Sequence, residues 1–123
     1  MTQQELFEKD LEKVGMPGQK SLEVGGFKAL IRRTPMGYLC GYVEVPEGLA
    51  VDTDHVDCHG GVTFDQSGVD GFPTAGRYIG FDCAHACDWT PWYHDGLYRD
   101  YEYVVKEIKG LVQQLKEKEV PRL

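Results

Sequence analysis

Residues 97–118 read LYRDYEYVVKEIKGLVQQLKEK, and apolar side chains return in them every three or four positions. That spacing matches the roughly 3.6-residue turn of an α-helix and places these side chains along one face. The apolar positions are Leu97, Tyr98, Tyr101, Val104, Val105, Ile108, Leu111, Val112 and Leu115. We therefore predict an amphipathic helix over about residues 98–118, with its apolar stripe buried against the rest of the chain.

A shorter helical pattern covers residues 2–14. Thr2 is suited to cap its first turn, and Gly15 is suited to end it. The apolar positions on its inner face are Leu6, Phe7, Leu11 and Val14. The next stretch, residues 15–25 (GMPGQKSLEVG), is rich in Gly and Pro, so we predict a connector there.

Runs typical of β-strands fill the middle of the chain. The predicted strands are residues 26–33, 38–45, 61–65 and 77–82. The turn sequence TPMG joins the first two strands into a hairpin, and residues 66–76 are predicted to form a long surface loop. We therefore predict a single α+β domain over residues 1–123. In it, a small antiparallel sheet of about four strands carries the N-terminal helix and the long C-terminal helix on one face.

The chain is small and acidic, with 123 residues, 13 Lys and Arg, 20 Asp and Glu, and a net charge of −7. This balance argues against binding to duplex DNA or RNA, which requires a basic face. No apolar run approaches the roughly 20 residues of a membrane span. The first residues also lack the basic start and the apolar stretch of a signal peptide. We therefore expect a cytoplasmic protein with no membrane association.

Residues suited to catalysis or ligand binding are concentrated in positions 51–95. This segment holds eight Asp and a single basic residue, Arg77, together with all four His and both Trp. Every acid in it is Asp, which is typical of loops and ligand positions rather than of helices. A functional site is therefore expected within this segment.

Asp82, His85 and Asp88 are three residues apart and follow a predicted strand. On a helical turn they would share one face and could hold a divalent metal. The alternative is a structural helix start, in which Asp82 caps the first turn and His85 points to solvent. A metal or catalytic site and a plain structural turn both stay open.

His59, Gly60 and Gly61 form a second cluster. Adjacent glycines let the backbone approach a ligand closely, and a His beside them could act as acid or base or orient a phosphate. The alternative is a glycine bulge at a strand start, with His59 hydrogen-bonded to the main chain.

The four Cys are predicted to be thiols or metal ligands rather than disulfides, because no signal peptide accompanies them. A zinc site built from Cys58, His59, Cys83 and Cys87 would be unusual, because no pair of Cys has the common structural-zinc spacing. A nucleophile pair of Cys83 and His85 is a further option, although a thiol near a His is more often simply buried.

Aromatic side chains in the same segment could stack on a nucleotide base. The candidates are Phe81, Trp89 and Trp92, and packing in the core is the alternative for each. Residues 89–93 (WTPWY) include a Pro and are expected at the surface, as a lid or a partner contact. Arg77 and Arg99 are the cations expected to neutralise a phosphate.

Residues 59–64 (HGGVTF) and 79–88 (IGFDCAHACD) resemble motifs of a family of small, largely uncharacterised proteins encoded by bacteriophages and prophages. Residues 41–48 (GYVEVPEG) fit the same pattern, and the resemblance covers roughly residues 37–115. The family pattern has Gly where this chain has Cys87, which argues against a zinc site that uses Cys87. The resemblance implies an accessory phage protein in the host cytoplasm. Such proteins often blunt host defence, for example by removing a cyclic dinucleotide or a cyclic ADP-ribose derivative.

Three functions, one of them enzymatic, stay open at this level. The first is a module that sequesters a nucleotide-derived small molecule, with contacts from His59, Gly60, Gly61, Arg77, Phe81, Trp89, Trp92 and Arg99. The second is a metal-dependent hydrolase of such a nucleotide. Its ion would lie on Asp82, His85 and Asp88, and its catalytic set would be His59, Asp82 and His85. The third is an inhibitor of a host protein that acts through residues 89–93. A binder of this size is expected to share its pocket across a homo-oligomer interface.

Overall fold

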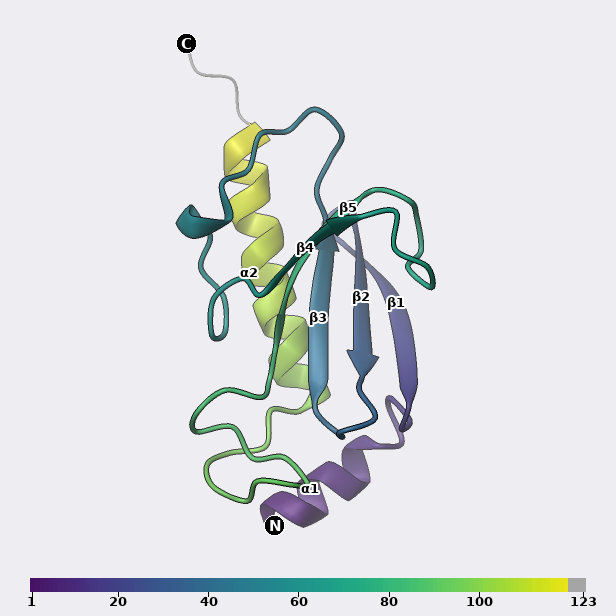
Figure 1. The fold of residues 1–123 in the computed structure, drawn as a ribbon, viewed down its shortest axis with the longest axis vertical. Coiled ribbons are helices and arrows are strands. Elements are labelled where there is room, and N and C mark those ends of the chain that lie inside the picture. Colours follow the sequence, from purple (N-terminus) through teal and green to yellow (C-terminus); the bar gives the residue numbers. More distant parts are fainter. Residues whose placement is uncertain (120–123) are drawn as a thin grey trace.

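The computed structural model of the chain describes residues 1–119 (Figure 1). Its elements are α1 (Gln3–Asp10), β1 (Gly18–Val24), β2 (Phe27–Arg33), β3 (Leu39–Glu44), η1 (Thr53–His55), β4 (Phe64–Ser67), β5 (Arg77–Asp82) and α2 (Tyr101–Glu119). The five strands form one antiparallel sheet in the order β1-β2-β3-β5-β4, and α2 packs on it. The predicted α+β fold is therefore confirmed, with five strands in place of about four. No helix within residues 1–119 is long and apolar enough to cross a membrane.

The additional strand, β1, lies where the sequence predicts a connector, so that prediction is wrong. β1 pairs with β2 over all seven of its residues. Gly25 and Gly26 form the turn between them, and their φ angles of 57° and 87° suit the mirror-image turns that hairpins prefer. Because β1 is an edge strand, only Leu22 and Val24 pack toward the core, and its hydrophobic pattern is correspondingly weak.

The other elements match the predicted ones with shifted ends. β2 and β3 each end within one residue of the predicted strands, and β5 covers the predicted residues 77–82. β4 begins three residues later than predicted, because Gly60 and Gly61 turn the chain with φ angles of 68° and 81°. α2 begins at Tyr101 rather than at residue 98, because the Asp100 carboxylate caps the helix by accepting the Tyr103 N–H.

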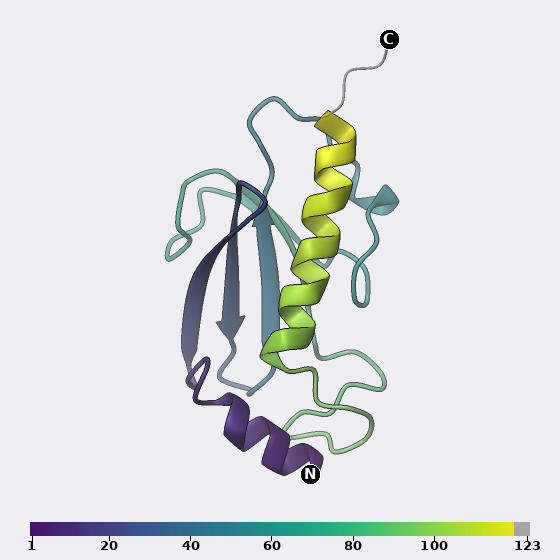
Figure 2. The same ribbon diagram turned by 180° about the vertical axis from the view of Figure 1, so that it is seen from behind.

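Helix α2 runs along the sheet and supplies much of the main core (Figure 2). Its inner side chains are all buried: Val104, Ile108, Leu111, Val112 and Leu115. They belong to one cluster with the sheet residues Ala29, Ile31, Val43, Ile79 and Phe81. The predicted amphipathic helix is confirmed, and burial of its apolar stripe fixes α2 against the sheet.

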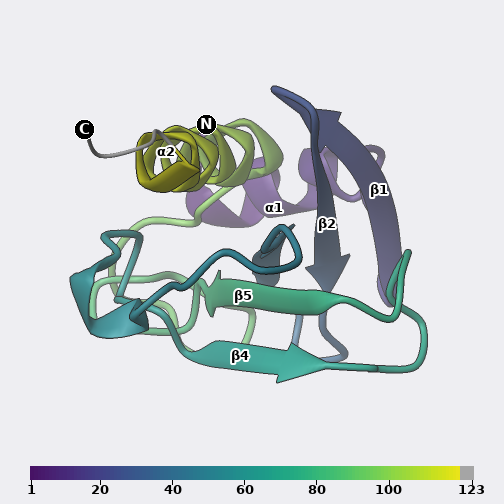
Figure 3. The ribbon, with the colours of Figure 1, turned by 90° about the horizontal axis from the view of Figure 1, so that it is seen from above.

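The sheet is strongly twisted, and Figure 3 shows β4 and β5 crossing the direction of β1 and β2. Two glycines permit the close approach of β3 and β5. A Cβ at Gly80 would lie 2.5 Å from the carbonyl oxygen of Gly41, and a Cβ at Gly41 would lie 2.6 Å from the Phe81 ring. Side chains at these two positions would force the strands apart, so the twist depends on both glycines.

The sheet face away from α2 is covered by the loop of residues 68–76. Its Phe72 ring packs edge-on against Tyr42 at 4.9 Å and against Tyr78 at 5.0 Å between ring centroids. It also stacks on Phe64 at 5.4 Å. This long loop therefore completes a second small core instead of running freely over the surface.

Helix α1 lies across one end of the sheet rather than on its face (Figure 1), which corrects the predicted packing. Phe7 is its only buried apolar side chain, and the Phe7 ring lies 5.7 Å from Trp89 and 5.6 Å from Tyr98 between centroids. Beside them, the buried Arg33 guanidinium donates to the Asp10 carboxylate at 3.2 Å. One apolar residue is too narrow a stripe to cover a sheet face, so α1 closes an end instead.

Candidate functional site

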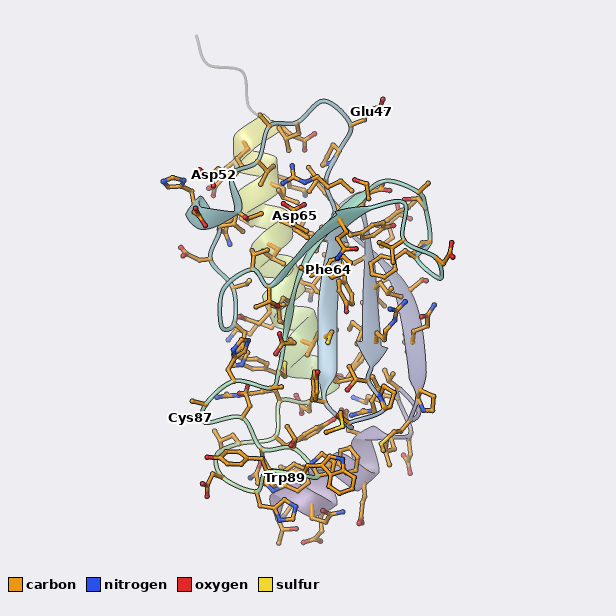
Figure 4. All side chains as sticks on the ribbon, viewed as in Figure 1. Glu47, Asp52, Phe64, Asp65, Cys87 and Trp89 are labelled. Carbon is orange, nitrogen blue, oxygen red and sulfur yellow. The ribbon has the colours of Figure 1, made fainter. Side chains whose placement is uncertain are left out.

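The two sequence clusters meet beside the start of α2. Figure 4 places Cys87 and Trp89 in loops at the end of the molecule where α1 lies, whereas Glu47 and Asp52 lie at the opposite end. Hydrogen bonds join these loops to His59 and to the first turn of α2. The structure therefore brings together residues that lie up to 44 positions apart in the chain.

Asp88 is the centre of this arrangement, with a carboxylate that is fully buried. Its Oδ2 accepts the His59 Nε2 hydrogen at 2.7 Å and the His85 backbone N–H at 3.0 Å, and its Oδ1 accepts Arg99 Nε at 2.9 Å. Burial raises the pKa of the Asp88 carboxyl, but the hydrogen bonds from His59 and Arg99 outweigh it and bring the pKa below its ordinary value. Asp88 is therefore a charged, fully satisfied anchor.

His59 links Asp88 to α2. Its Nδ1 lies 2.7 Å from the Tyr103 hydroxyl, and the two rings meet edge-on at 5.3 Å between centroids. The Arg99 guanidinium lies over the Tyr103 ring, 4.9 Å from the ring centroid. Because both nitrogens of His59 already have protein partners, this residue positions the loops and presents no unused nitrogen to a ligand.

His85 has a different environment, with a side chain that is about one-third exposed. Its Nε2 lies 3.3 Å from Asp82 Oδ1, close enough for attraction but not aligned as a hydrogen bond, and among the described residues this buried nitrogen has no other partner. The Asp82 carboxylate accepts the Thr63 hydroxyl at 2.9 Å and the Ala84 N–H at 3.1 Å.

Gly60 holds the His85 ring in place. A Cβ at Gly60 would lie 2.3 Å from the His85 ring, so only Gly permits this close contact. Gly60 therefore serves the packing of His85, whereas a Cβ at Gly61 would meet nothing within 4 Å. Contact of these glycines with a ligand stays a prediction.

The predicted metal triad of Asp82, His85 and Asp88 is not assembled. Residues 82–88 form a turn rather than a helix, so the three side chains do not share a face. Asp88 directs its carboxylate to His59 and Arg99 instead. Within residues 1–119, no group of three or more His, Cys, Asp or Glu side chains is placed to hold a metal ion. That statement also covers the zinc site considered from Cys58, His59, Cys83 and Cys87.

The Cys83 and His85 nucleophile pair is also unsupported. Cys83 is buried, and burial raises the pKa of its thiol far above the ordinary range. Burial likewise raises the pKa of Cys58 to about 11. Both thiols are therefore protonated at neutral pH, and a protonated thiol is a poor nucleophile.

An aromatic groove of about 390 Å³ lies beside His85. Its lining residues are Met36, Tyr38, Ala84, His85, Ala86, Asp88, Thr90, Trp92 and Tyr93. Trp92 is 73% exposed and Tyr93 is 57% exposed, which is unusual for large aromatic side chains. A larger hollow of about 620 Å³ lies at the other end of the sheet, but no aromatic ring of the described chain lines it.

The remaining predicted ligand contacts lie outside this groove. Phe81 is buried in the core beneath α2, and Trp89 is buried and stacked on His94. Arg77 is paired with Asp65 on β4, and Arg99 is held by Asp88. Of the predicted stacking and cationic residues, only Trp92 lines the aromatic groove.

The sequence did not reveal the opposite wall of the groove, formed by Met36 and Tyr38. Both lie in the turn between β2 and β3. Because β3 pairs with β5, with Cys40 opposite Asp82, this turn comes beside the residues that follow β5. To predict this wall from the sequence, one must know that β3 and β5 are neighbours in the sheet. Hydrophobic periodicity identifies strands but not which strands pair.

Comparison of the chain with protein-family models, with curated proteins and with solved structures gave no match. The resemblance to phage-encoded proteins therefore stays a prediction, and the functional argument rests on the geometry of the site.

Proposed function

We propose that this protein is a binding module that captures a nucleotide-derived small molecule by stacking its base in the aromatic groove. The observation that carries the proposal is the exposed Trp92 ring in a hollow that also presents Tyr38 and His85. Stacking of a base on an aromatic side chain contributes about 1–3 kcal/mol. The volume of about 390 Å³ falls in the range of small-molecule sites.

The base, and not the phosphate, provides the binding energy in this proposal, because each of the four arginines within residues 1–119 already has a partner. Arg32 donates to Gln19 and lies over the Phe72 ring, and Arg33 is buried against Asp10. The other two are held by carboxylates, Arg77 by Asp65 and Arg99 by Asp88. A phosphate on the ligand would therefore face solvent.

Calorimetric titration with adenosine and with AMP tests this proposal. We expect both to bind with similar affinity, and we expect Trp92→Ala to weaken both by roughly tenfold or more, as the loss of one stacking contact implies. Leu97→Ala is the matched control, because Leu97 is 54% exposed and does not line the groove. Recovery of intact ligand from the denatured complex would distinguish capture from cleavage. Absence of binding by both compounds, or full binding by Trp92→Ala, would overturn the proposal.

A second candidate function is acid–base cleavage of the bound ligand, favoured by the pairing of His85 with Asp82. A His beside a carboxylate at the edge of a pocket is suited to take a proton from water or from a ligand hydroxyl. Because the metal triad is not assembled, this version is independent of metal. Turnover of ligand that persists in a chelator and is lost in His85→Ala would favour this candidate over capture.

A further inference from the structure

We infer that the stacked ring carries a positive charge, so that the aromatic groove selects planar aromatic cations such as N-alkylated purine or pyridinium rings. This inference rests on the proposed function, because it specifies the ligand of the same groove. It follows from three features of the groove: its aromatic walls, its carboxylates, and the placement of the nearest guanidinium.

The aromatic walls favour a cation. Tyr38, Trp92 and Tyr93 line the groove, and the face of an aromatic ring carries partial negative charge. Trp is the strongest partner for a cation among these rings. Met36 adds a polarizable sulfur to the same hollow. A ring that is both flat and positive uses stacking and cation–π attraction together.

The charges around the groove also favour a cationic ligand. Asp88 lines the groove, Asp82 lies behind His85, and the exposed Asp95 follows Tyr93 by two residues. No Lys or Arg of the described residues is among those that line it. Because Asp88 is buried and paired, the negative charge nearest the groove comes from Asp82, whose side chain is 27% exposed, and the lining offers an anionic ligand no Lys or Arg of the described residues.

The guanidinium nearest the groove, that of Arg99, does not offset this negative charge. Arg99 donates its Nε to Asp88 and lies over the Tyr103 ring, on the side of Asp88 that faces α2. It cancels the charge of Asp88 but leaves that of Asp82. A neutral ring in the groove would gain only stacking, and a negatively charged ring would meet net repulsion.

Two isomeric nucleosides provide a direct test. The two nucleosides differ in the position of one methyl group: 1-methyladenosine takes up a proton and is mainly a cation at pH 7.5, and N6-methyladenosine stays neutral. We expect 1-methyladenosine to bind roughly tenfold more tightly than N6-methyladenosine or adenosine. In Asp82→Asn the ratio of the affinities for 1-methyladenosine and adenosine should fall. Asp54→Asn removes the same charge on η1, away from the groove, and should leave the preference unchanged.

Equal binding of the two isomers would overturn this inference and leave the proposed function standing. Tighter binding of AMP than of adenosine would also overturn it, because the phosphate would then have found a cation. If no nucleoside binds, the proposed function fails and this inference fails with it. A preference for the cation that survives Asp82→Asn but is lost in Asp54→Asn would likewise contradict it.

Discussion

Cys87 has a φ angle of 73°, in the left-handed region that side chains rarely adopt. A residue with a Cβ pays roughly 1–2 kcal/mol there, and Gly avoids most of that cost. We predict that Cys87→Gly raises the free energy of unfolding by about 1 kcal/mol, measured by urea denaturation. Cys87→Ala removes the sulfur but keeps the Cβ, so it should leave stability nearly unchanged. An equal gain in both variants would show that the thiol, not the backbone, causes the strain.

Substitutions at Gly60 and Gly61 separate the cost of a positive φ angle from the cost of a steric collision. Both have positive φ, but a Cβ at Gly60 would collide with the His85 ring, whereas one at Gly61 would meet nothing within 4 Å. We predict that Gly60→Ala lowers stability by about 2 kcal/mol or more and displaces His85, seen as a shift of its imidazole NMR signals. Gly61→Ala should cost only about 1 kcal/mol and leave those signals in place. Equal effects of the two substitutions would contradict the close packing of His85 on Gly60.

The candidate residues divide by burial, which the sequence does not reveal. Trp89 and Trp92 are three positions apart in one irregular segment, yet Trp89 is 4% exposed and Trp92 is 73% exposed. His59 and His85 were equivalent candidates for acid–base chemistry, and their hydrogen bonds distinguish them. Residue type and spacing indicated the segment of the candidate site, but the contacts of each of its residues come from distant segments.

At the scale of elements, Asp88 joins the loop of His59 to the loop of His85 and to the start of α2. Its folded-state pKa is lowered, so its contribution to stability is present above the unfolded pKa of about 4 and is lost as pH falls through the folded value. We predict that Asp88→Asn lowers the free energy of unfolding by about 3 kcal/mol at pH 7, because it breaks a buried charged pair. The difference from the wild type should shrink as pH falls from about 5 through the unfolded pKa of about 4 and then through the lowered folded pKa of Asp88. Urea denaturation across this range is the measurement, and a difference that is independent of pH would contradict the role of the charge.

Helices and strands with a clear hydrophobic periodicity were predicted from the sequence, and an element with a weak pattern was missed. α2 repeats its apolar stripe over about three turns, from Val104 to Leu115, and was found from the sequence, as were the central strands β2, β3 and β5. β1 was missed because an edge strand needs few buried side chains, although the glycine pair Gly25 and Gly26 between it and β2 was a usable hairpin signal. The groove could not be predicted, because it depends on β3 lying next to β5.

At the scale of the whole molecule, the aromatic groove leaves a group of large apolar side chains uncovered. Met36 is 51% exposed, Tyr93 is 57% exposed and Trp92 is 73% exposed. Because such groups often mark interaction surfaces, we predict that a second copy of the chain completes the groove. Light scattering should then give at least twice the monomer mass of 13.9 kDa, and Trp92→Asp should restore the monomer. A monomeric mass at all concentrations would contradict this prediction.

Two buried carboxylates hold the same end of α2. Asp10 on α1 accepts the Tyr101 N–H at 3.1 Å, and Asp88 binds Arg99 just before the helix. Neither contact can open without exposing a buried charge, so we expect α1, the groove loops and the first turn of α2 to open as one cooperative unit in native-state hydrogen exchange. A ligand in the groove would consequently slow amide exchange in α1, an element that it does not touch.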